Sequence, residues 1–381
     1  MNWMQRAVVL TLVTLTCFAL GCSKEVKIGA VVSETGAVAS YGESVRNGMD
    51  LALEEVNAAG GFEGGAFTIT YIDDGTDAAQ GKAAARDLLD QGVNVLVGAL
   101  SSRVTEAIIP LATKAEVPVL SPSASAASLT GASPYFFRNF PSDILEGTAM
   151  AKFASDHGVE SVAIFVVDDT YGQGLVKIFR ENFENSFRSV VEQFDYNEGN
   201  EASFADIAAQ VKALDPDGIY IVSYLEESSQ LLAALDEAGC DSVVLASGSV
   251  TPELLQRAGA AADRLVYPQP SFDPESNERE VAEFVRAYRA AYNTEPDIYA
   301  AHGYDAVKLI HRAVEIAEST YPKSIQEGLG SIQDYRGAAG MTTFDNSGDV
   351  VRYPSIMIVK DGKPIPFDQF KNDGGSLLAD R

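Results

Sequence analysis

The chain has 381 residues and is strongly acidic, with 54 Asp and Glu against 28 Lys and Arg and a formal net charge of −26. Nucleic-acid binding needs a basic surface against the phosphates, so this balance excludes it. The length is sufficient for two lobes, each with a hydrophobic core of its own.

The N-terminus has the pattern of a secretory signal. One charge at Arg6 precedes the apolar stretch 7–20, which is too short for a transmembrane helix. The ending Ala19-Leu20-Gly21-Cys22 resembles a bacterial lipoprotein cleavage box with the usual Leu and Ala positions swapped. It predicts removal of the signal peptide 1–21, a lipid on Cys22, and a membrane-anchored protein on the periplasmic side of the cell envelope. Ordinary secretion with an incidental Cys22 is the alternative.

Cysteine and histidine are scarce. Cys17 lies in the predicted signal and Cys22 would carry the lipid, so Cys240 is left alone and no intramolecular disulfide is expected. The three histidines form no Cys/His cluster at metal-ligand spacing. We therefore expect neither a metal nor a cofactor.

From residue 26 onward, apolar strands alternate with amphipathic helices. The first set has predicted strands over 26–32, 67–72, 93–97 and 117–120 and helices over 42–59, 78–91 and 104–115. The second has strands over 161–167, 190–194, 218–222, 243–246 and 265–267 and helices over 144–157, 172–185, 204–214 and 228–238. Long helices over 278–292 and 299–319 follow, then a strand over 355–359 and a hairpin turn at 360–363. This alternation predicts an α/β protein with parallel sheets.

Two neighbouring strands of the first set end in serine-rich turns. One turn reads Gly98-Ala99-Leu100-Ser101-Ser102 and the other Ser121-Pro122-Ser123-Ala124-Ser125. Free N–H groups and a partial positive charge at helix starts suit an anion such as a carboxylate, and serine hydroxyls add donors. The alternative is that these serines only cap helices. Two such turns at the carboxyl ends of strands favour a ligand site.

Tyrosines occur at the same rim of the predicted sheets. Tyr41 is expected in the loop after the first strand, Tyr171 follows Asp168-Asp169, and Tyr224 follows the strand over 218–222. Their placement in both sets predicts a cleft lined with aromatic rings.

Catalytic signatures are missing from the sequence. It has no G-x-S-x-G, H-E-x-x-H or G-x-G-x-x-G pattern, and His157, His302 and His311 are interpreted as structural. No nucleophile–base pair supports a hydrolase, so we do not expect an enzyme.

Short motifs follow one another in order along residues 26–381. They are Val26-Lys27-Ile28-Gly29, Thr35-Gly36, Tyr41-Gly42, Val56-Asn57-Ala58-Ala59-Gly60-Gly61, Asp73-Asp74, the two serine turns, Phe137-Arg138, Asp169-Thr170-Tyr171-Gly172-Gln173-Gly174 and Tyr304-Asp305-Ala306. In this order they resemble the type I periplasmic solute-binding proteins, specifically the leucine/isoleucine/valine-binding branch that feeds ABC importers.

The resemblance implies two Rossmann-like lobes with parallel central sheets, joined by a three-crossing hinge near residues 140, 268 and 347. Lobe 1 would comprise 22–140 and 269–346, and lobe 2 would comprise 141–268 and 347–381. It also implies a monomer that passes a small carboxylate ligand to an inner-membrane ABC permease. A non-transport sensor or envelope scaffold of the same fold is the alternative.

The resemblance further implies the roles of particular residues. The ligand carboxylate would be held by Ser102, Ser123 (mainly through its backbone) and Ser125. The ligand body would be enclosed by Tyr41, Leu100, Ser101, Tyr171, Tyr224 and Tyr299, with Gly248 beside it.

One departure from the family concerns charge. Amino-acid binders of this branch have an acidic residue after the strand that matches 243–246, where this chain reads Ser247-Gly248-Ser249-Val250. A buried ammonium without a charged partner is costly. Either another carboxylate substitutes, with Asp169, Glu226 and Glu227 as candidates, or the ligand is an organic acid without an ammonium group.

Overall fold

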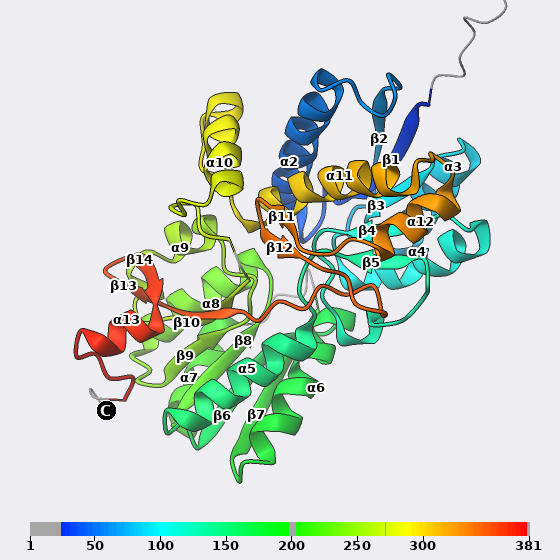
Figure 1. Ribbon diagram of the computed structural model, residues 1–381. Helices are drawn as coiled ribbons and strands as arrows, with labels where there is room; N and C mark the ends of the chain where they lie inside the picture. The colour runs from blue at the N-terminus through cyan, green and yellow to red at the C-terminus, as the bar shows by residue number, and fades with distance from the viewer. Residues whose placement is uncertain (1–23, 198–202, 271, 379–381) are drawn as a thin grey trace, which may run out of the picture.

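Two sheets, each covered by helices, form two lobes in the computed structural model, which describes residues 24–197, 203–270 and 272–378 (Figure 1). The predicted signal peptide and Cys22 lie outside the described residues. No helix in the described ranges combines the length and apolar character needed to cross a membrane. The predicted two-lobed α/β class is confirmed.

The first sheet is parallel throughout, with strand order β2-β1-β3-β4-β5. Both of its faces are covered by helices, which is why β1 is buried at every position but one and reads as a continuous apolar run. Its strands are β1 (Val26–Val32), β2 (Phe67–Asp73), β3 (Val95–Gly98), β4 (Val119–Ser121) and β5 (Phe136–Arg138).

The helices of the first lobe come from both ends of the chain. The early ones are α2 (Ala39–Ala58), α3 (Ala78–Asp90), α4 (Ser102–Ala115) and the short η1 (Ala127–Leu129); the late ones are α10 (Arg279–Tyr292), α11 (Ile298–Ala317) and α12 (Pro322–Gly330). Helix α11 packs along α2, at the top of Figure 1. Between its early and its late helices, which pack together in the first lobe, the chain therefore passes through the whole of the second lobe.

The second sheet has strand order β14-β13-β10-β9-β8-β6-β7. Its strands are β6 (Ser161–Val167), β7 (Ser189–Tyr196), β8 (Gly218–Val222), β9 (Val243–Ala246), β10 (Val266–Gln269), β13 (Ser355–Lys360) and β14 (Lys363–Pro366). The centre of this sheet is parallel, as expected, while at its edge β13 pairs antiparallel with β10 and with β14. The hairpin turn expected at 360–363 joins β13 to β14, and a hairpin requires antiparallel strands.

In the described part of the chain, helices and one short 3-10 turn surround this second sheet. They are α5 (Asp143–Asp156), α6 (Thr170–Glu184), α7 (Phe204–Leu214), α8 (Leu225–Ala238), α9 (Pro252–Ala258) and η2 (Gly259–Ala262), with α13 (Phe367–Asn372) against the β13–β14 hairpin. A separate antiparallel ribbon is formed by β11 (Tyr335–Gly337) and β12 (Gly340–Thr342).

The chain crosses between the sheets after β5, after β10 and before β13. The residue borders expected near 140, 268 and 347 stay a prediction. One crossing is fastened by a buried ion pair in which Arg138 Nε and Nη2 each donate to Asp349 at 2.7 Å. The lobes also meet where the Thr170 hydroxyl of α6 donates to Glu106 of α4 at 3.1 Å.

Candidate functional site

All ten residues proposed from the sequence as ligand-binding line one cavity between the lobes. We call this cavity, of about 40 Å³, the cleft cavity. Its lining residues are Val38, Tyr41, Leu100, Ser101, Ser102, Ser123, Ser125, Phe140, Glu146, Tyr171, Tyr224, Gly248, Ser249 and Tyr299. Nearly all of them are buried, so the two lobes are closed over the cavity.

The serine turns stand at the carboxyl ends of β3 and β4. Ser101 caps α4, since its Oγ accepts from Val104 N at 3.4 Å. Ser102 is different, because its Oγ accepts from Ala126 N at 3.1 Å and thereby joins the two turns. A hydroxyl that accepts from one backbone N–H still has its own proton to donate. Ser101 is therefore a helix cap, whereas the Ser102 hydroxyl lines the cavity, and its role in ligand binding stays a prediction.

The amino end of α4 contributes a positive potential to the same wall. The first backbone N–H groups of a helix have no acceptor within the helix, and the helix dipole adds to their attraction for an anion. Because α4 begins at Ser102 and this residue lines the cleft cavity, an anion in the cavity meets these groups directly. Ser123 and Ser125 approach from the following turn.

Two groups of stacked rings enclose the cavity. On one wall Tyr41 stacks on Tyr299 with ring centroids 4.2 Å apart, and Phe140 lies parallel to Tyr299 at 5.9 Å. On the other wall Tyr171 and Tyr224 stack at 5.9 Å. Rings with an apolar body and a polar edge suit the body of a small organic ligand.

The positions of the tyrosines correct one expectation. Tyr41 does not lie in the loop after β1 but in the first turn of α2, which begins at Ala39 rather than Gly42. Tyr171 and Tyr299 likewise lie in the first turns of α6 and α11, and Tyr224 immediately precedes α8. The helix starts therefore carry the rings that surround the cavity.

A carboxylate that was not anticipated from the sequence faces the cavity. Glu146, from the first turn of α5, accepts a hydrogen bond on Oε1 from Gly248 N at 2.8 Å. Burial, reinforced by the neighbouring Asp143, raises the pKa of Glu146 to about 8. Burial also raises the pKa of Asp143, three residues earlier, to about 7.

The three acidic residues considered from the sequence are used elsewhere. Asp169 caps α6, accepting from Gly172 N at 2.9 Å, and its other oxygen accepts from the Tyr224 hydroxyl at 2.7 Å. Glu226 is exposed and pairs with Arg257. Glu227 is half-buried, and like the other two it is absent from the cavity lining. The choice of these candidates was therefore wrong.

Three further lining residues were missed by sequence reasoning. Val38 and Phe140 are ordinary apolar residues. Ser249 lies in the loop after β9, and its hydroxyl donates at 2.9 Å to the backbone oxygen of Ser223, which follows β8. Val38 lies close to the motif Tyr41-Gly42, and Phe140 lies close to the strand end at Phe137-Arg138. Glu146 had no local signal that distinguished it from the many other acidic residues.

The histidines lie in packed surroundings. His157 stacks on Phe153, His311 contacts Phe67 edge-on, and His302 is fully buried beside Phe140. Burial, together with the nearby Arg352, lowers the pKa of His302 to about 3. Among the described residues, no group of three His, Cys, Asp or Glu side chains is placed to hold a metal ion.

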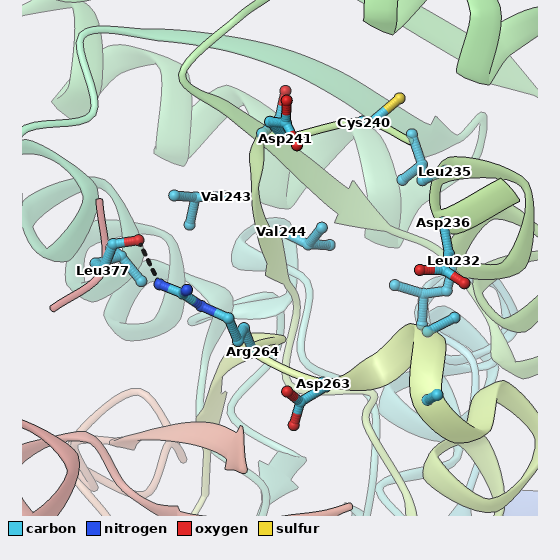
Figure 2. A pocket seen from close by; sticks show the side chains of 13 residues that line it. Leu232, Leu235, Asp236, Cys240, Asp241, Val243, Val244, Asp263, Arg264 and Leu377 are labelled. Atoms are coloured by element: carbon cyan, nitrogen blue, oxygen red, sulfur yellow. Dashed lines mark hydrogen bonds between the residues drawn. The ribbon is translucent and has the colours of Figure 1, made fainter. Parts of the chain in front are cut away.

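A second cavity, of about 420 Å³, lies in the second lobe away from the cleft (Figure 2). Residues around the start of β9 line it, including Cys240 and Val243, and Arg264 Nη2 donates to Leu377 O at 2.9 Å across one side. This is the amino end of the strands, whereas ligands of α/β sheets bind at the carboxyl ends. The cleft cavity is therefore the candidate site.

A buried, polar and aromatic cavity between two α/β lobes is the arrangement of a two-lobed binding protein. A family model described as periplasmic binding protein matches residues 25–363. The leucine-, isoleucine-, valine-, threonine- and alanine-binding protein of Pseudomonas aeruginosa is 25% identical over 332 residues, covering 86% of this chain and 88% of the relative.

Solved structures agree with the family match. LivJ of Streptococcus pneumoniae, a branched-chain amino acid transporter substrate-binding protein in complex with isoleucine, is 29% identical, with a TM-score of 0.82 over 90% of this chain and 98% of that one. The leucine-binding protein LivK of Thermotoga maritima is 26% identical, with a TM-score of 0.83 over 90% and 97%.

The chain belongs to the periplasmic binding protein family, in the leucine/isoleucine/valine-binding branch of the type I fold. It is a solute-binding protein and not an enzyme, since the family, the relatives and the structural neighbours are all described as binding proteins. Membership of this family implies an extracytoplasmic location.

Proposed function

We propose that the protein captures a small carboxylate ligand in the cleft cavity and delivers it to an inner-membrane ABC permease. The observation that carries this proposal is the gathering of both serine turns and both ring stacks, from two lobes, around one buried cavity. A ligand that contacts both lobes only when they are closed stabilises the closed state.

The carboxylate is assigned to the serine wall. The Ser102 and Ser125 hydroxyls, the backbone of Ser123 and the amino end of α4 donate to it. Charge-assisted hydrogen bonds of this kind are stronger than neutral ones. The ligand body lies between the rings of Tyr41, Tyr171, Tyr224 and Tyr299, beside Leu100, Ser101 and Gly248. Micromolar affinity needs about 8 kcal/mol, which several such bonds plus aromatic burial can supply.

The ligand class is proposed from the relatives together with the site. The Pseudomonas relative is named for binding small aliphatic amino acids, and LivJ holds isoleucine. An aliphatic amino acid fits a cavity with an anion-binding wall and rings around the ligand body. An aromatic or short aliphatic acid without an ammonium group would fit the same two features.

A thermal-shift panel of amino acids and organic acids tests this function. Ligand at 100 times its dissociation constant should stabilise the protein by about 2.7 kcal/mol, visible as a higher melting temperature. The Ser102→Ala/Ser125→Ala variant should lose the shift, while Ser155→Ala, a serine on α5 outside the cavity, should keep it. A full shift in the double variant would contradict the site.

We also propose that a lipid on Cys22 holds the protein at the membrane after the signal peptide 1–21 is removed. The sequence Ala19-Leu20-Gly21-Cys22 supports this anchor. Labelled palmitate should be incorporated by the full-length chain and not by its Cys22→Ala variant.

A further inference from the structure

We propose that Glu146 receives the α-ammonium group of the ligand, so that the protein binds α-amino acids through an acidic residue of α5 in place of one in the loop after β9. This inference rests on the proposed function, because it assigns the second half of the same site. It resolves the question left by the missing carboxylate after β9 in favour of an amino acid.

The first support is the space beside Gly248, which the Glu146 carboxylate occupies. A Cβ added to Gly248 would lie 2.7 Å from Glu146 Oε2 and 3.1 Å from Pro268 O. The Glu146 carboxylate therefore occupies the space into which a side chain at 248 would project. Gly248 N holds Oε1 at 2.8 Å, which fixes the carboxylate at the cavity wall. A side chain at 248 would require the Glu146 carboxylate to move from this position.

The second support is the surplus of buried acid. Asp143 is fully buried three residues before Glu146, and its carboxylate has no basic partner and no well-aligned hydrogen bond among the described residues. The polar side chain that acts on it is the Ser125 hydroxyl of the cavity wall. The hydroxyl of Tyr220, on β8, is likewise buried without a partner. Both groups interact electrostatically with Glu146. Unsatisfied buried polar groups are rare in folded proteins and point to a missing partner.

The third support is the lack of a competing cation. Arg138 is the one positive charge among the groups that act on this acidic pair. Its Nε and Nη2 already bind Asp349, and its Nη1 donates to Ala126 O. The other groups that act on the pair are Asp169 and Tyr171 from α6, Tyr220 from β8 and Tyr299 from α11, and none of them is a cation. Buried acids in such surroundings favour a positively charged ligand group.

The position of Glu146 relative to the serine wall completes the argument. Both line the same cavity, Glu146 from the second lobe and Ser102 from the first. An α-amino acid carries its two charged groups on one carbon, so it can bridge the lobes at this point. A deaminated acid fills only the serine wall and leaves the acidic side unpaired.

Binding of an ammonium group to Glu146 has a consequence for pH. The raised pKa means that the empty site holds a proton near neutral pH, and this proton must leave when the ammonium binds. Affinity for an amino acid should therefore rise with pH, by about 50-fold between pH 6 and pH 8, because one proton is released. Affinity for a deaminated acid should not follow this slope.

Calorimetric titration with matched pairs of ligands tests the inference. The pairs are L-leucine and 4-methylpentanoate, L-alanine and propanoate, and L-phenylalanine and 3-phenylpropanoate. At pH 8 we expect at least one amino acid to bind 30-fold or more tightly than its deaminated partner. Glu146→Gln should remove this preference with little change for the partner, while Asp156→Asn, on the exposed side of the same helix, should leave both affinities unchanged.

A relocation variant separates a direct role from a structural one. Glu146→Ala/Gly248→Glu moves the acid to the loop after β9, and we expect it to recover at least part of the preference lost in Glu146→Gln. Equal affinity within each pair, or an undiminished preference in Glu146→Gln, would overturn the inference and leave the proposed function standing. Failure of every probe to bind would overturn both.

Discussion

Residues 146 and 248 act as one unit, although a hundred positions separate them. The Glu146 carboxylate occupies the space beside Gly248 that a side chain at 248 would enter, and Gly248 N orients this carboxylate. Half of this unit was visible in the sequence, since the stretch 247–250 after β9 has no acidic residue. The other half could not be predicted, since an acidic residue in the first turn of a helix is usually explained by the helix dipole.

Removal of the buried charge should stabilise the empty protein at high pH. Burial raises the pKa of Glu146 from 4.5 in the unfolded chain to about 8 in the folded protein. Between these two values the folded state keeps a proton that the unfolded chain releases, so stability falls as the pH rises from about 4.5 to about 8. Urea unfolding should show ligand-free Glu146→Gln more stable than the wild type by about 1–3 kcal/mol at pH 8.5.

The same comparison near pH 4 should show little difference, because Glu146 is then protonated in both folded and unfolded states. Asp156→Asn provides the control for the loss of one acidic residue from α5. A Glu146→Gln variant that is less stable than the wild type at pH 8.5 would contradict the assigned burial cost.

Among the other site residues, Ser102, Ser125, Tyr171 and Tyr224 could be located from the sequence. Each stands at or just after the end of an apolar strand, and such ends meet at one rim of a parallel sheet. Val38 and Phe140 could not, because an apolar residue that lines a cavity has the same local pattern as one that fills a core.

At the scale of elements, the long apolar runs were predicted well. The strand over 26–32 was placed at its observed bounds, and both long helices near residues 279–317 were found within two residues at each end. Short elements were missed. Helix α9 has seven residues, and β11 and β12 have three each. Such short segments contain too few residues for a hydrophobic period to be recognised.

A signal for α9 was nevertheless present. Thr251 caps it by accepting from Leu254 N at 3.2 Å, and Pro252 occupies the first helical position. A capping residue followed by proline is a known helix start. The antiparallel pairing of β13 with β10 had no such local signal, because it depends on where the chain returns to the second lobe.

The ion pair that fastens the last crossing should be critical for stability. Arg138 is fully buried, and besides Asp349 it donates to Ala126 O at 2.9 Å and to the Thr130 hydroxyl at 2.6 Å. Asp349→Asn leaves a buried guanidinium without its counter-charge, which should lower the free energy of unfolding by about 3–5 kcal/mol.

Chemical denaturation measures this loss. Glu253→Gln, which removes an exposed ion pair with Arg257, is the matched control and should change stability by less than about 1 kcal/mol. An effect of Asp349→Asn as small as that of the control would show that the pair does not fasten the crossing.

In the whole molecule, one bound ligand is proposed to contact both lobes at the same time. The serine wall belongs to the first lobe and the Glu146 wall to the second, so each charged group of an amino acid is assigned to a different lobe. The order of motifs along the chain predicted the two-lobed class, and the family match confirms it. The closeness of the lobes, with the site buried between them, depends on long-range packing and could not be predicted from sequence.

A crystal structure of the protein with the amino acid that stabilises it most is the most direct test of this account. We predict a ligand in the cleft cavity with its carboxylate oxygens about 2.7–3.2 Å from the Ser102 and Ser125 hydroxyls and its nitrogen at the same distance from Glu146. A ligand bound in another cavity, or in the cleft with its nitrogen away from Glu146, would contradict it.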